Sequence, residues 1–589
     1  MARLRSKIEK TITLILSILE NAFNSGIFYG WPSLVFILKQ QQFFREGCDD
    51  DVSPAAVLLN DSFGYATSSP LGSEYVTDIQ YVLTGNDSGP GQENDMGDHM
   101  LPCDSQDSKF QLVFTVAAFC MQGSVFPSGL LFDRCGTRFV RILFSVFILA
   151  GHLFLGFSTP ARANFLFPAG ILIGIGGILM MVCSMQVSNL FGPNKATVMT
   201  LMSGCFDSSA VVMLIVKLSY EAGLPMSTAF FILAGATIFF SINTFILLPV
   251  KRIPWPLPSG YVQVKRCCGG TEEKEAVMTQ EEIDMKVADE NGTEKEKLNR
   301  NGSIVNGSDR RKSSGTKANG GGSTRRKSRV IQAEAEACKK QYFPTIRSCI
   351  LSPLFWLLVA WISILQLRLI FMIGTLNPWL SRLSNNDEQV VSKYTNVFSF
   401  IQFCGFLVAP LGGLLLDRNK MTTGWFANKH LDKRSPYADL KDTCFPLALT
   451  TILFTIFSIC IVIPKLELQY LTFIIQVVIR SFLYGLSCAA IPIMFPQEYF
   501  GTLFGVMGSF AGIFGLLQYP IFSILQNVLN NDPFILNICF IVFNLLTASL
   551  PIYIWFFVRR KEKQYKLEQE EELHEEKYTI LPATSPSDA

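Results

Sequence analysis

The chain consists largely of long apolar runs separated by shorter polar segments. A helix needs about 20 mainly apolar residues to cross a bilayer, because lipid offers the backbone no hydrogen-bond partners. Twelve runs reach roughly this length, with the third and the ninth the shortest. The sequence therefore predicts an all-α membrane protein with both termini on one side. The predicted spans are residues 11–38, 110–132, 141–158, 165–190, 196–219, 227–249, 353–380, 391–416, 444–463, 469–494, 501–526 and 534–558.

Two long polar segments divide the apolar runs. Residues 40–109 follow the first run, and residues 251–345 follow the sixth. The second segment is rich in Gly, Ser, Lys and Glu, so it cannot bury enough apolar surface to offset its chain entropy. We predict an extracellular loop at the first segment and a disordered cytoplasmic linker at the second. The remaining predicted parts are an N-terminus (1–10), two six-helix halves (11–250 and 346–558) and a cytoplasmic tail (559–589).

The composition supports a membrane protein and argues against several other classes. Only 17% of the residues are charged, whereas a soluble domain carries about 25%. The net charge of +2 gives no general attraction to nucleic acid. Four histidines disfavour a His-based catalytic site, and no metal-ligand cluster, nucleophile elbow or phosphate loop stands out. We expect no enzyme activity, no metal and no cofactor.

The basic residues predict which face of the membrane each segment occupies. Arginine and lysine cluster before the first run, after the second and after the last, all on one face, which the positive-inside rule makes cytoplasmic. The opposite face receives residues 40–109, which contain glycosylation sequons at Asn60 and Asn86. Cys48 and Cys103 lie near the two ends of the same loop, where an extracellular disulfide is expected. We therefore predict a multi-pass plasma-membrane protein with both termini in the cytoplasm.

A short motif after the second run recurs after the eighth, at the matching place in the other half. Parallel six-helix halves are typical of the major facilitator fold. The glycines of the motif are expected to allow close helix approach, and its Asp and Arg residues to form a cytoplasmic gate. An alternative is that the arginines only obey the positive-inside rule. The second copy lacks the later Gly and Arg. The predicted gate residues are Gly129, Asp133, Arg134, Gly136, Arg138, Asp417 and Arg418.

Polar and charged residues inside the runs form a candidate central site. Such residues are rare in membrane spans and usually face a cavity or a partner. Two acids and two bases allow neutralising pairs, which the sequence does not assign. The functional interpretation is recognition of a polar, near-planar solute, and the alternative is ion pairing between helices. We expect Lys217 only to extend outward near the end of its helix. The candidate site residues are Glu20, Asn24, Asp207, Ser208, Arg368, Gln476 and Arg480.

Several stretches resemble solute carrier family 43 of the major facilitator superfamily. Within that family, Phe206-Asp-Ser-Ser209 looks less like the members that carry large neutral amino acids than like those that carry nucleobases. The resemblance implies facilitated diffusion of purine nucleobases such as adenine, guanine and hypoxanthine, without sodium or proton coupling. The long loop, the long linker and Arg368 depart from the family. The other stretches are Gly30-Trp-Pro-Ser-Leu34, Ile253-Pro-Trp-Pro-Leu-Pro258, Ile373-Gly-Thr-Leu-Asn377, Leu468-Gln-Tyr-Leu-Thr-Phe473 and Arg480-Ser-Phe-Leu-Tyr-Gly485.

Three functional hypotheses remain open from the sequence. The first is a nucleobase uniporter, the second is a uniporter of large neutral amino acids, and the third is a transport-inactive membrane receptor or scaffold. Glu, Asn, Gln and Arg can pair with a purine edge as well as with the two charges of an amino acid. Several charges near the bilayer midplane argue against the scaffold, which has little need of them.

The predicted linker carries a repeated basic pattern that could serve regulation. Ser313 and Ser328 each follow an Arg-Arg-Lys triplet, which suits a basophilic kinase, and phosphorylation would add about −1.5 to −2 charge at each site. The basic clusters could otherwise lie against anionic lipid of the bilayer. The competing interpretation is a solubilising spacer.

Overall fold

The computed structural model describes residues 2–46, 48, 103–246, 253, 336–418, 435 and 437–579. Every regular element within these ranges is a helix. The predicted glycosylation sites Asn60 and Asn86 and the predicted phosphorylation sites Ser313 and Ser328 lie outside the described residues.

The first half of the chain folds into helices that begin and end near the predicted runs. The first run is interrupted at residues 25 and 26, and its two parts are bent by 45°. The helices are α1 (Ala2–Asn24), η1 (Ile27–Gly30), α2 (Trp31–Gln40), α4 (Asp104–Gly123), α5 (Val125–Gly156), η3 (Pro160–Phe165), α6 (Leu166–Met185), η4 (Gln186–Asn194), α7 (Lys195–Ser208), α8 (Val211–Glu221) and α9 (Met226–Ile246).

The second half repeats this pattern of long and interrupted helices. Local signals set the starts: Ser352 accepts a hydrogen bond from the amide of Phe355, and Pro353 occupies the first turn of α13. The helices are α12 (Ile346–Ile350), α13 (Pro353–Gly374), α14 (Leu376–Leu383), α15 (Glu388–Phe403), α16 (Gly405–Asp417), α17 (Ala438–Val462), α18 (Leu468–Met494), η6 (Gln497–Tyr499), α19 (Phe500–Gly515), α20 (Gln518–Asn527), α21 (Phe534–Leu546) and α22 (Ser549–Thr579).

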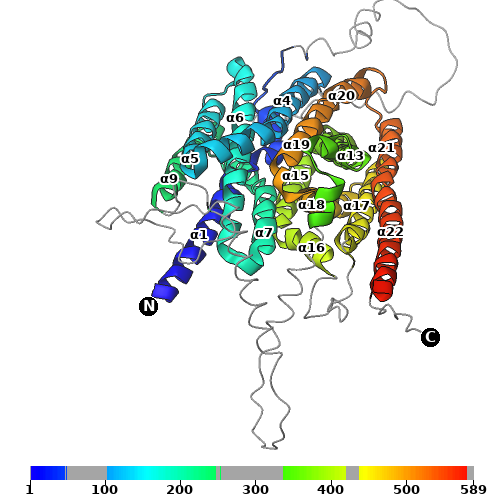
Figure 1. Cartoon of the computed structure of the whole chain (residues 1–589). Coiled ribbons are helices and arrows are strands. Elements are labelled where there is room, and N and C mark those ends of the chain that lie inside the picture. The colour runs from blue at the N-terminus through cyan, green and yellow to red at the C-terminus, as the bar shows by residue number, and fades with distance from the viewer. Residues whose placement is uncertain are drawn as a thin grey trace, which may run out of the picture. The chain divides into compact units, whose positions relative to one another are not determined.

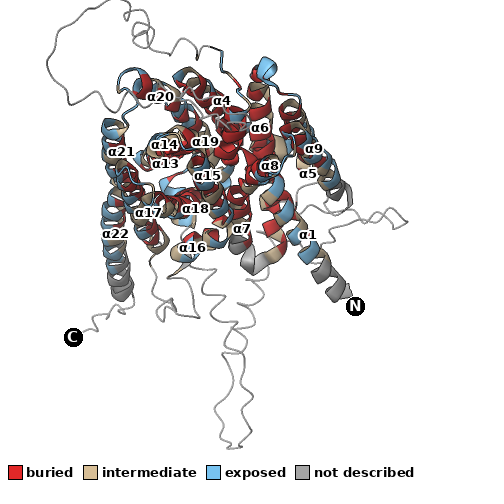
Figure 2. Ribbon diagram, turned by 180° about the vertical axis from the view of Figure 1, so that it is seen from behind, coloured by how far each residue is buried: buried red, intermediate tan, exposed pale blue. Residues whose placement is uncertain are grey.

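The described helices are long and apolar enough for a polytopic membrane protein. Nine of them are long enough to cross a bilayer, or up to eleven when each of two bent pairs is taken as one span. Residues 226–241 form a shorter apolar helix. Each of the twelve predicted runs coincides with one of these segments. Many large apolar side chains are exposed, among them Ile15 on α1 and Phe556 on α22, which suits contact with lipid. Figure 2 shows exposed residues along both of these helices.

The two sides of the helix bundle can be named by what lies at them. Figure 1 shows α4 and α20 near one edge, and the start of α1 and the end of α22 at the opposite edge. We call the first the disulfide side, because the Cys48–Cys103 bond closes the chain there, with a Cα–Cα distance of 5.7 Å. We call the other the linker side, because residues 246 and 336 lie at helices that lead to the predicted linker. The predicted disulfide is thus present.

One prediction about the ends of elements needs correction. The disordered linker was expected to run to residue 345, but residues 336–342 form a helix. Phe343 follows that helix and is buried, with its ring 4.9 Å from that of Phe495. At the other end of the chain, α22 continues as one helix to Thr579, into the predicted cytoplasmic tail (559–589). Apolar packing at the first place and a long charged helix at the second extend regular structure beyond the predicted limits.

Candidate functional site

A central cavity of about 670 Å³ is lined by residues from both halves of the chain. Tyr29 and Phe206 come from the first half and Tyr484 from the second. The lining continues to Met185 and Pro492, near the linker-side ends of α6 and α18. Its volume lies within the range of about 300–1,000 Å³ that is usual for small-molecule sites. The cavity therefore reaches from the middle of the bundle toward the linker side.

The lining of this cavity is aromatic, apolar and uncharged. None of the described lining residues is an Asp, Glu, Lys or Arg. Hydrogen-bonding capacity comes from amides and hydroxyls, and flat apolar surface comes from aromatic rings. Such a lining can stack an aromatic side chain on a flat ring of a ligand. It can also form hydrogen bonds with the polar edge of that ligand through uncharged donors and acceptors. Its polar residues are Gln122, Thr200, Ser203, Gln366 and Ser487, together with Tyr29 and Tyr484.

A buried ion pair joins the two halves directly behind the cavity wall. Asp207 Oδ1 and Arg480 Nη2 are 2.9 Å apart, and their side chains are 4% and 1% exposed. The Arg480 guanidinium lies over the Tyr29 ring, 3.7 Å from its centroid, and the Tyr29 and Tyr484 hydroxyls are 3.0 Å apart. Any displacement of Tyr29 by an occupant of the cavity would therefore reach the ion pair.

Two glutamines extend the polar cluster around Arg480. Arg480 Nη1 donates a hydrogen bond to Gln402 Oε1 at 3.0 Å, and Gln402 Nε2 donates to Gln476 Oε1. All three side chains are buried. Of the predicted site residues, the structure thus brings Asp207, Gln476 and Arg480 together, and none of them lines the cavity itself.

Glu20 and Asn24 belong to a different cluster, inside the first half. Glu20 Oε2 and Arg141 Nη2 are 2.6 Å apart, with both side chains 1% exposed. Asn24 donates a hydrogen bond to the Glu20 carbonyl at 3.1 Å, so it serves the helix backbone before the break at residue 25. Arg141 also lies 3.6 Å from the Met180 sulfur. This pair links α1, α5 and α6.

Ser208 and Arg368 also lie apart from the central cavity. Ser208 donates a hydrogen bond to the Phe403 carbonyl at 2.8 Å and accepts one from the Phe406 amide at 3.0 Å, so it bonds to the break between α15 and α16. Arg368 lines a separate pocket near the disulfide side. Its predicted place in the central site differs from its observed place, because α13 turns it toward Ser458 on α17 and Phe540 on α21.

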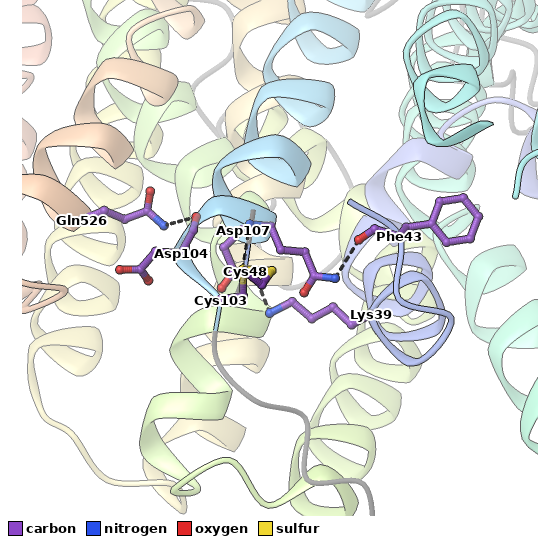
Figure 3. Close-up of a disulfide and its surroundings, with 8 residues drawn as sticks. Lys39, Phe43, Cys48, Cys103, Asp104, Asp107 and Gln526 are labelled. Carbon is purple, nitrogen blue, oxygen red and sulfur yellow. Dashed lines mark hydrogen bonds and ion pairs between the residues drawn. A yellow bond between two sulfur atoms is a disulfide. The ribbon is translucent and has the colours of Figure 1, made fainter. Parts of the chain in front are cut away.

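The disulfide side is closed by contacts around the Cys48–Cys103 bond, shown in Figure 3. Lys39 on α2 and Asp107 on α4 form an ion pair with a 2.5 Å separation. Gln526 on α20 donates a hydrogen bond to the Asp104 carbonyl at 3.0 Å, which ties the second half to the first. The covalent bond and these polar contacts therefore hold the ends of three helices together.

Further contacts between the two halves of the chain lie on the disulfide side. Asn377 donates to the Pro32 carbonyl at 2.7 Å, at the interrupted first helices of the two halves. Lys217 was expected to extend outward, but it is fully buried and bonds to Glu221 at 2.8 Å. It also donates to Ser392 Oγ at 2.6 Å, across the interface with α15. The nearby acceptors explain why Lys217 turns inward.

The predicted gate motif has a structural role that differs in part from the expected one. Gly136 has φ 75°, a left-handed value that favours glycine, and it marks the kink inside α5. A Cβ at Gly129 would meet no atom within 4 Å, so Gly129 does not provide the expected close approach. Arg134 is exposed and Arg138 is half-buried.

In the second copy of the motif, the Arg418 side chain is bonded to backbone carbonyls. Arg418 donates hydrogen bonds to the Leu415 and Asp442 carbonyls, at 2.6 and 3.2 Å. Its guanidinium also lies 5.0 Å from the Phe445 ring centroid. The side chains of Asp133 and Asp417 are outside the described part of the structure. The gate function of both copies stays a prediction.

Sequence reasoning missed the residues that line the cavity. Tyr484 lies four residues after Arg480 and shares its helix face, so this spacing could have indicated it. Tyr29 follows the break in the first helix, which its sequence alone does not reveal. Gln122 and Gln366 are amides within apolar runs, as Gln476 is, but only Gln476 is among the predicted site residues. Within the described residues, no three His, Cys, Asp or Glu lie together as a metal site.

The cavity, the broken helices and the repeated architecture define a membrane transporter of a known class. The chain belongs to the Major Facilitator Superfamily, whose family model matches residues 55–428, more than half of the sequence. The predicted fold class is confirmed. A solved structure of a POT family transporter in complex with 5-aminolevulinic acid has a TM-score of 0.50 and 13% identity, and the likeness covers 94% of this chain and 96% of that one. At this identity the likeness shows the fold alone.

Two curated relatives match nearly the whole chain. Equilibrative nucleobase transporter 1 from Bos taurus is 32% identical over 554 residues, which cover 94% of this chain and 97% of the relative. Large neutral amino acids transporter small subunit 3 from Homo sapiens is 26% identical over 579 residues, covering 93% and 94%. These relatives confirm the predicted resemblance to solute carrier family 43. They are transporters, as predicted, and not enzymes.

Proposed function

We propose that the protein is a facilitative transporter of purine nucleobases, such as adenine, guanine and hypoxanthine, that works by alternating access without sodium or proton coupling. The observation that carries this proposal is the uncharged, aromatic and amide-bearing lining of the central cavity. A nucleobase is flat, neutral and polar at its edge, so it matches rings for stacking and amides for hydrogen bonding.

The same lining disfavours the amino acid alternative. A free amino acid carries a carboxylate and an ammonium group, and burying either without an opposite charge or several hydrogen bonds is costly. The charged residues behind the Tyr29 wall of the cavity, Asp207 and Arg480, are paired with each other. An amino acid would have to break that pair or remain without charged partners. The greater identity to the nucleobase transporter than to the amino acid transporter points the same way.

The proposed mechanism uses the difference between the two sides of the bundle. The disulfide side is closed by bonds between the halves, such as Gln526 to Asp104 and Lys217 to Ser392. The cavity reaches the opposite helix ends. A substrate would enter at the linker side, stack against Tyr29 or Tyr484, and be released on the other side once the contacts there open. Because no ion site is required, the direction of net flux follows the substrate gradient.

The proposal is tested by uptake of labelled adenine and labelled leucine into cells that express the full chain. We expect adenine uptake that unlabelled guanine and hypoxanthine compete for, unchanged when choline replaces sodium and when external pH is varied. A Gln366→Leu variant should raise the KM for adenine, because it leaves the polar edge of the base without a neutral partner. Saturable leucine uptake without adenine uptake would establish the amino acid alternative, and uptake of neither would support the receptor or scaffold.

We also propose the orientation in which the disulfide side faces the cell exterior at the plasma membrane. The predicted sequons at Asn60 and Asn86 support it, as does the disulfide, which persists in oxidising compartments. A glycosidase should then increase gel mobility, and the shift should vanish in the Asn60→Gln/Asn86→Gln double variant. The same mobility before and after treatment, in a glycosylating cell, would contradict this orientation.

A further inference from the structure

A second pocket, of about 400 Å³, lies near the disulfide side and shares no lining residue with the central cavity. Most of its lining belongs to the second half, on α13, α14, α20 and α21, while Lys39, Asp104 and Asp107 come from the first half. Its volume is within the range that holds a small molecule. The pocket is therefore a separate place where a ligand could bind.

Two buried nitrogen donors that line this pocket lack an acceptor among the described residues. Arg368 is 1% exposed, and its Nη2 has no hydrogen-bond partner there. The Nε1 of Trp379, on α14, is also buried and unpartnered. A buried donor without an acceptor is destabilising, and more so when it is charged. The pocket thus offers donors to an occupant that brings acceptors.

Arg368 also lacks an opposite charge within the part of the chain that the structure describes. Its Nε donates to Ser458 Oγ at 3.1 Å, and its guanidinium lies 4.8 Å from the Phe540 ring centroid, but neither contact neutralises it. The other charges of the lining are already engaged. Lys39 pairs with Asp107 at 2.5 Å, and Asp104 accepts hydrogen bonds from Asn531 at 3.0 and 3.1 Å.

The remaining lining defines the body of the ligand. Phe371, Trp379 and Phe522 contribute aromatic surface next to Arg368 along α13, α14 and α20. We propose that this pocket binds a small organic carboxylate with an aromatic or apolar body, whose carboxylate pairs with Arg368. A guanidinium recognises a carboxylate through two parallel hydrogen bonds, and the apolar part packs against the aromatic wall. This pocket shares no lining residue with the central cavity, and its ligand does not depend on which substrate that cavity carries.

The test is binding of benzoate to the purified full-length protein, with benzamide as its neutral analogue. We expect benzoate to raise the melting temperature and to give saturable heat on titration, while benzamide at equal concentration gives neither. Arg368→Gln should weaken benzoate binding by at least about tenfold. The matched control is Arg382→Gln, which removes a cation of the same lining that is 46% exposed and pairs with Asp532. It should leave benzoate binding nearly unchanged.

A second variant keeps the proposal testable if Arg368→Gln does not fold. Thr375→Trp leaves Arg368 in place and fills the pocket from its lining, so it should also abolish benzoate binding. Benzoate affinity that is unchanged in either variant would overturn the proposal. So would equal stabilisation by benzamide, which would show that the carboxylate is not recognised. Equal stabilisation by sodium chloride would show a site for inorganic anions and would also overturn it.

Discussion

Two buried ion pairs of similar geometry occupy different places in the molecule. Glu20 and Arg141 are 2.6 Å apart within the first half, and Asp207 and Arg480 are 2.9 Å apart between the halves. All four side chains are nearly inaccessible to solvent. A pair inside one half can stay closed while the halves move as rigid bodies. A pair between the halves lies where alternating access requires movement.

The two pairs also differ in their distance from the cavity. Arg480 packs on Tyr29, which lines the cavity, whereas neither Glu20 nor Arg141 lines it. We therefore expect Asp207–Arg480 to couple the cavity to the interface, and Glu20–Arg141 to stabilise the first half. Similar burial and distance do not imply the same role.

The largest expected effect comes from neutralising the pair between the halves. Removing one partner of a buried pair leaves an unpaired charge, at a cost of about 3–5 kcal/mol, so single variants combine loss of stability with loss of coupling. The double variant Asp207→Asn/Arg480→Gln leaves no unpaired charge. We expect it to reach the cell surface near the parent level and to transport adenine about 5–150-fold more slowly. Initial uptake rates, normalised to surface biotinylation, provide the measurement.

Normal uptake by this double variant would show that the pair is only structural. It would also remove the distinction between the two pairs, because both could then be lost without effect on function. Uptake restored by the charge-reversed variant Asp207→Arg/Arg480→Asp would instead support a role for the pairing itself.

Breaking the pair inside the first half should give the opposite pattern. Glu20→Gln leaves Arg141 without its carboxylate, and we expect it to destabilise the fold by about 3–5 kcal/mol and to lower the amount of surface protein. Adding Arg141→Met also removes the cation of this pair. The double variant should regain stability, and each molecule should transport at the parent rate. Melting temperature reports the stability of each variant, and uptake per surface molecule reports its transport rate. If Glu20 takes part in transport, the stable double variant will lose uptake.

The sequence predicts the depth of these charges but not their pairing. Apolar runs placed Glu20, Asp207 and Arg480 near the bilayer midplane, where each is buried. Which acid meets which base depends on the rotation and packing of each helix, and no periodicity encodes that. Arg141 lies three residues after Arg138 of the predicted gate motif, and α5 continues past the motif and buries it.

Run lengths and basic clusters were likewise enough to predict the fold, because the bilayer imposes strict rules on length and charge. The cavity was less predictable. Tyr29 lies after a break in the first helix, and Lys217 turns inward because acceptors on α15 lie within reach. The break before Tyr29 and the inward direction of Lys217 both arise from contacts between segments far apart in the chain.

A smaller effect is expected at the disulfide side, where the halves meet through hydrogen bonds of Lys217. Lys217→Met loses the bonds to Ser392 and Asn396, at 2.6 and 2.7 Å, and should favour the state that is open on that side by about 1 kcal/mol or more. The measurement is labelling of a Ser33→Cys reporter by an impermeant thiol reagent, because Ser33 meets Ser399 across the same interface at 2.8 Å. We expect labelling to be several times faster.

The matched control for this experiment is Lys393→Met, which removes an exposed lysine from the same helix, α15. It should leave the labelling rate of the reporter unchanged. Equal acceleration by both variants would mean that charge at this surface, and not the contact between the halves, controls access.

The smallest effect on transport is expected from shortening the chain that connects the halves. If coupling passes through side chains such as Asp207 and Arg480, deleting residues 270–335 should leave uptake per surface molecule unchanged. This deletion removes Ser313 and Ser328, so it should alter only the amount of protein at the surface or its regulation by a basophilic kinase.

Extending the deletion to residue 345 should impair the protein, because it removes buried Phe343 and the hydrogen bond from Lys339 to the Pro492 carbonyl at 2.7 Å. Pro492 lines the central cavity, so the helix at 336–342 supports the transport unit itself. Comparing uptake and melting temperature of the two deletions locates the boundary between spacer and transporter, and loss of uptake in a correctly delivered 270–335 deletion would mean that the linker participates in coupling.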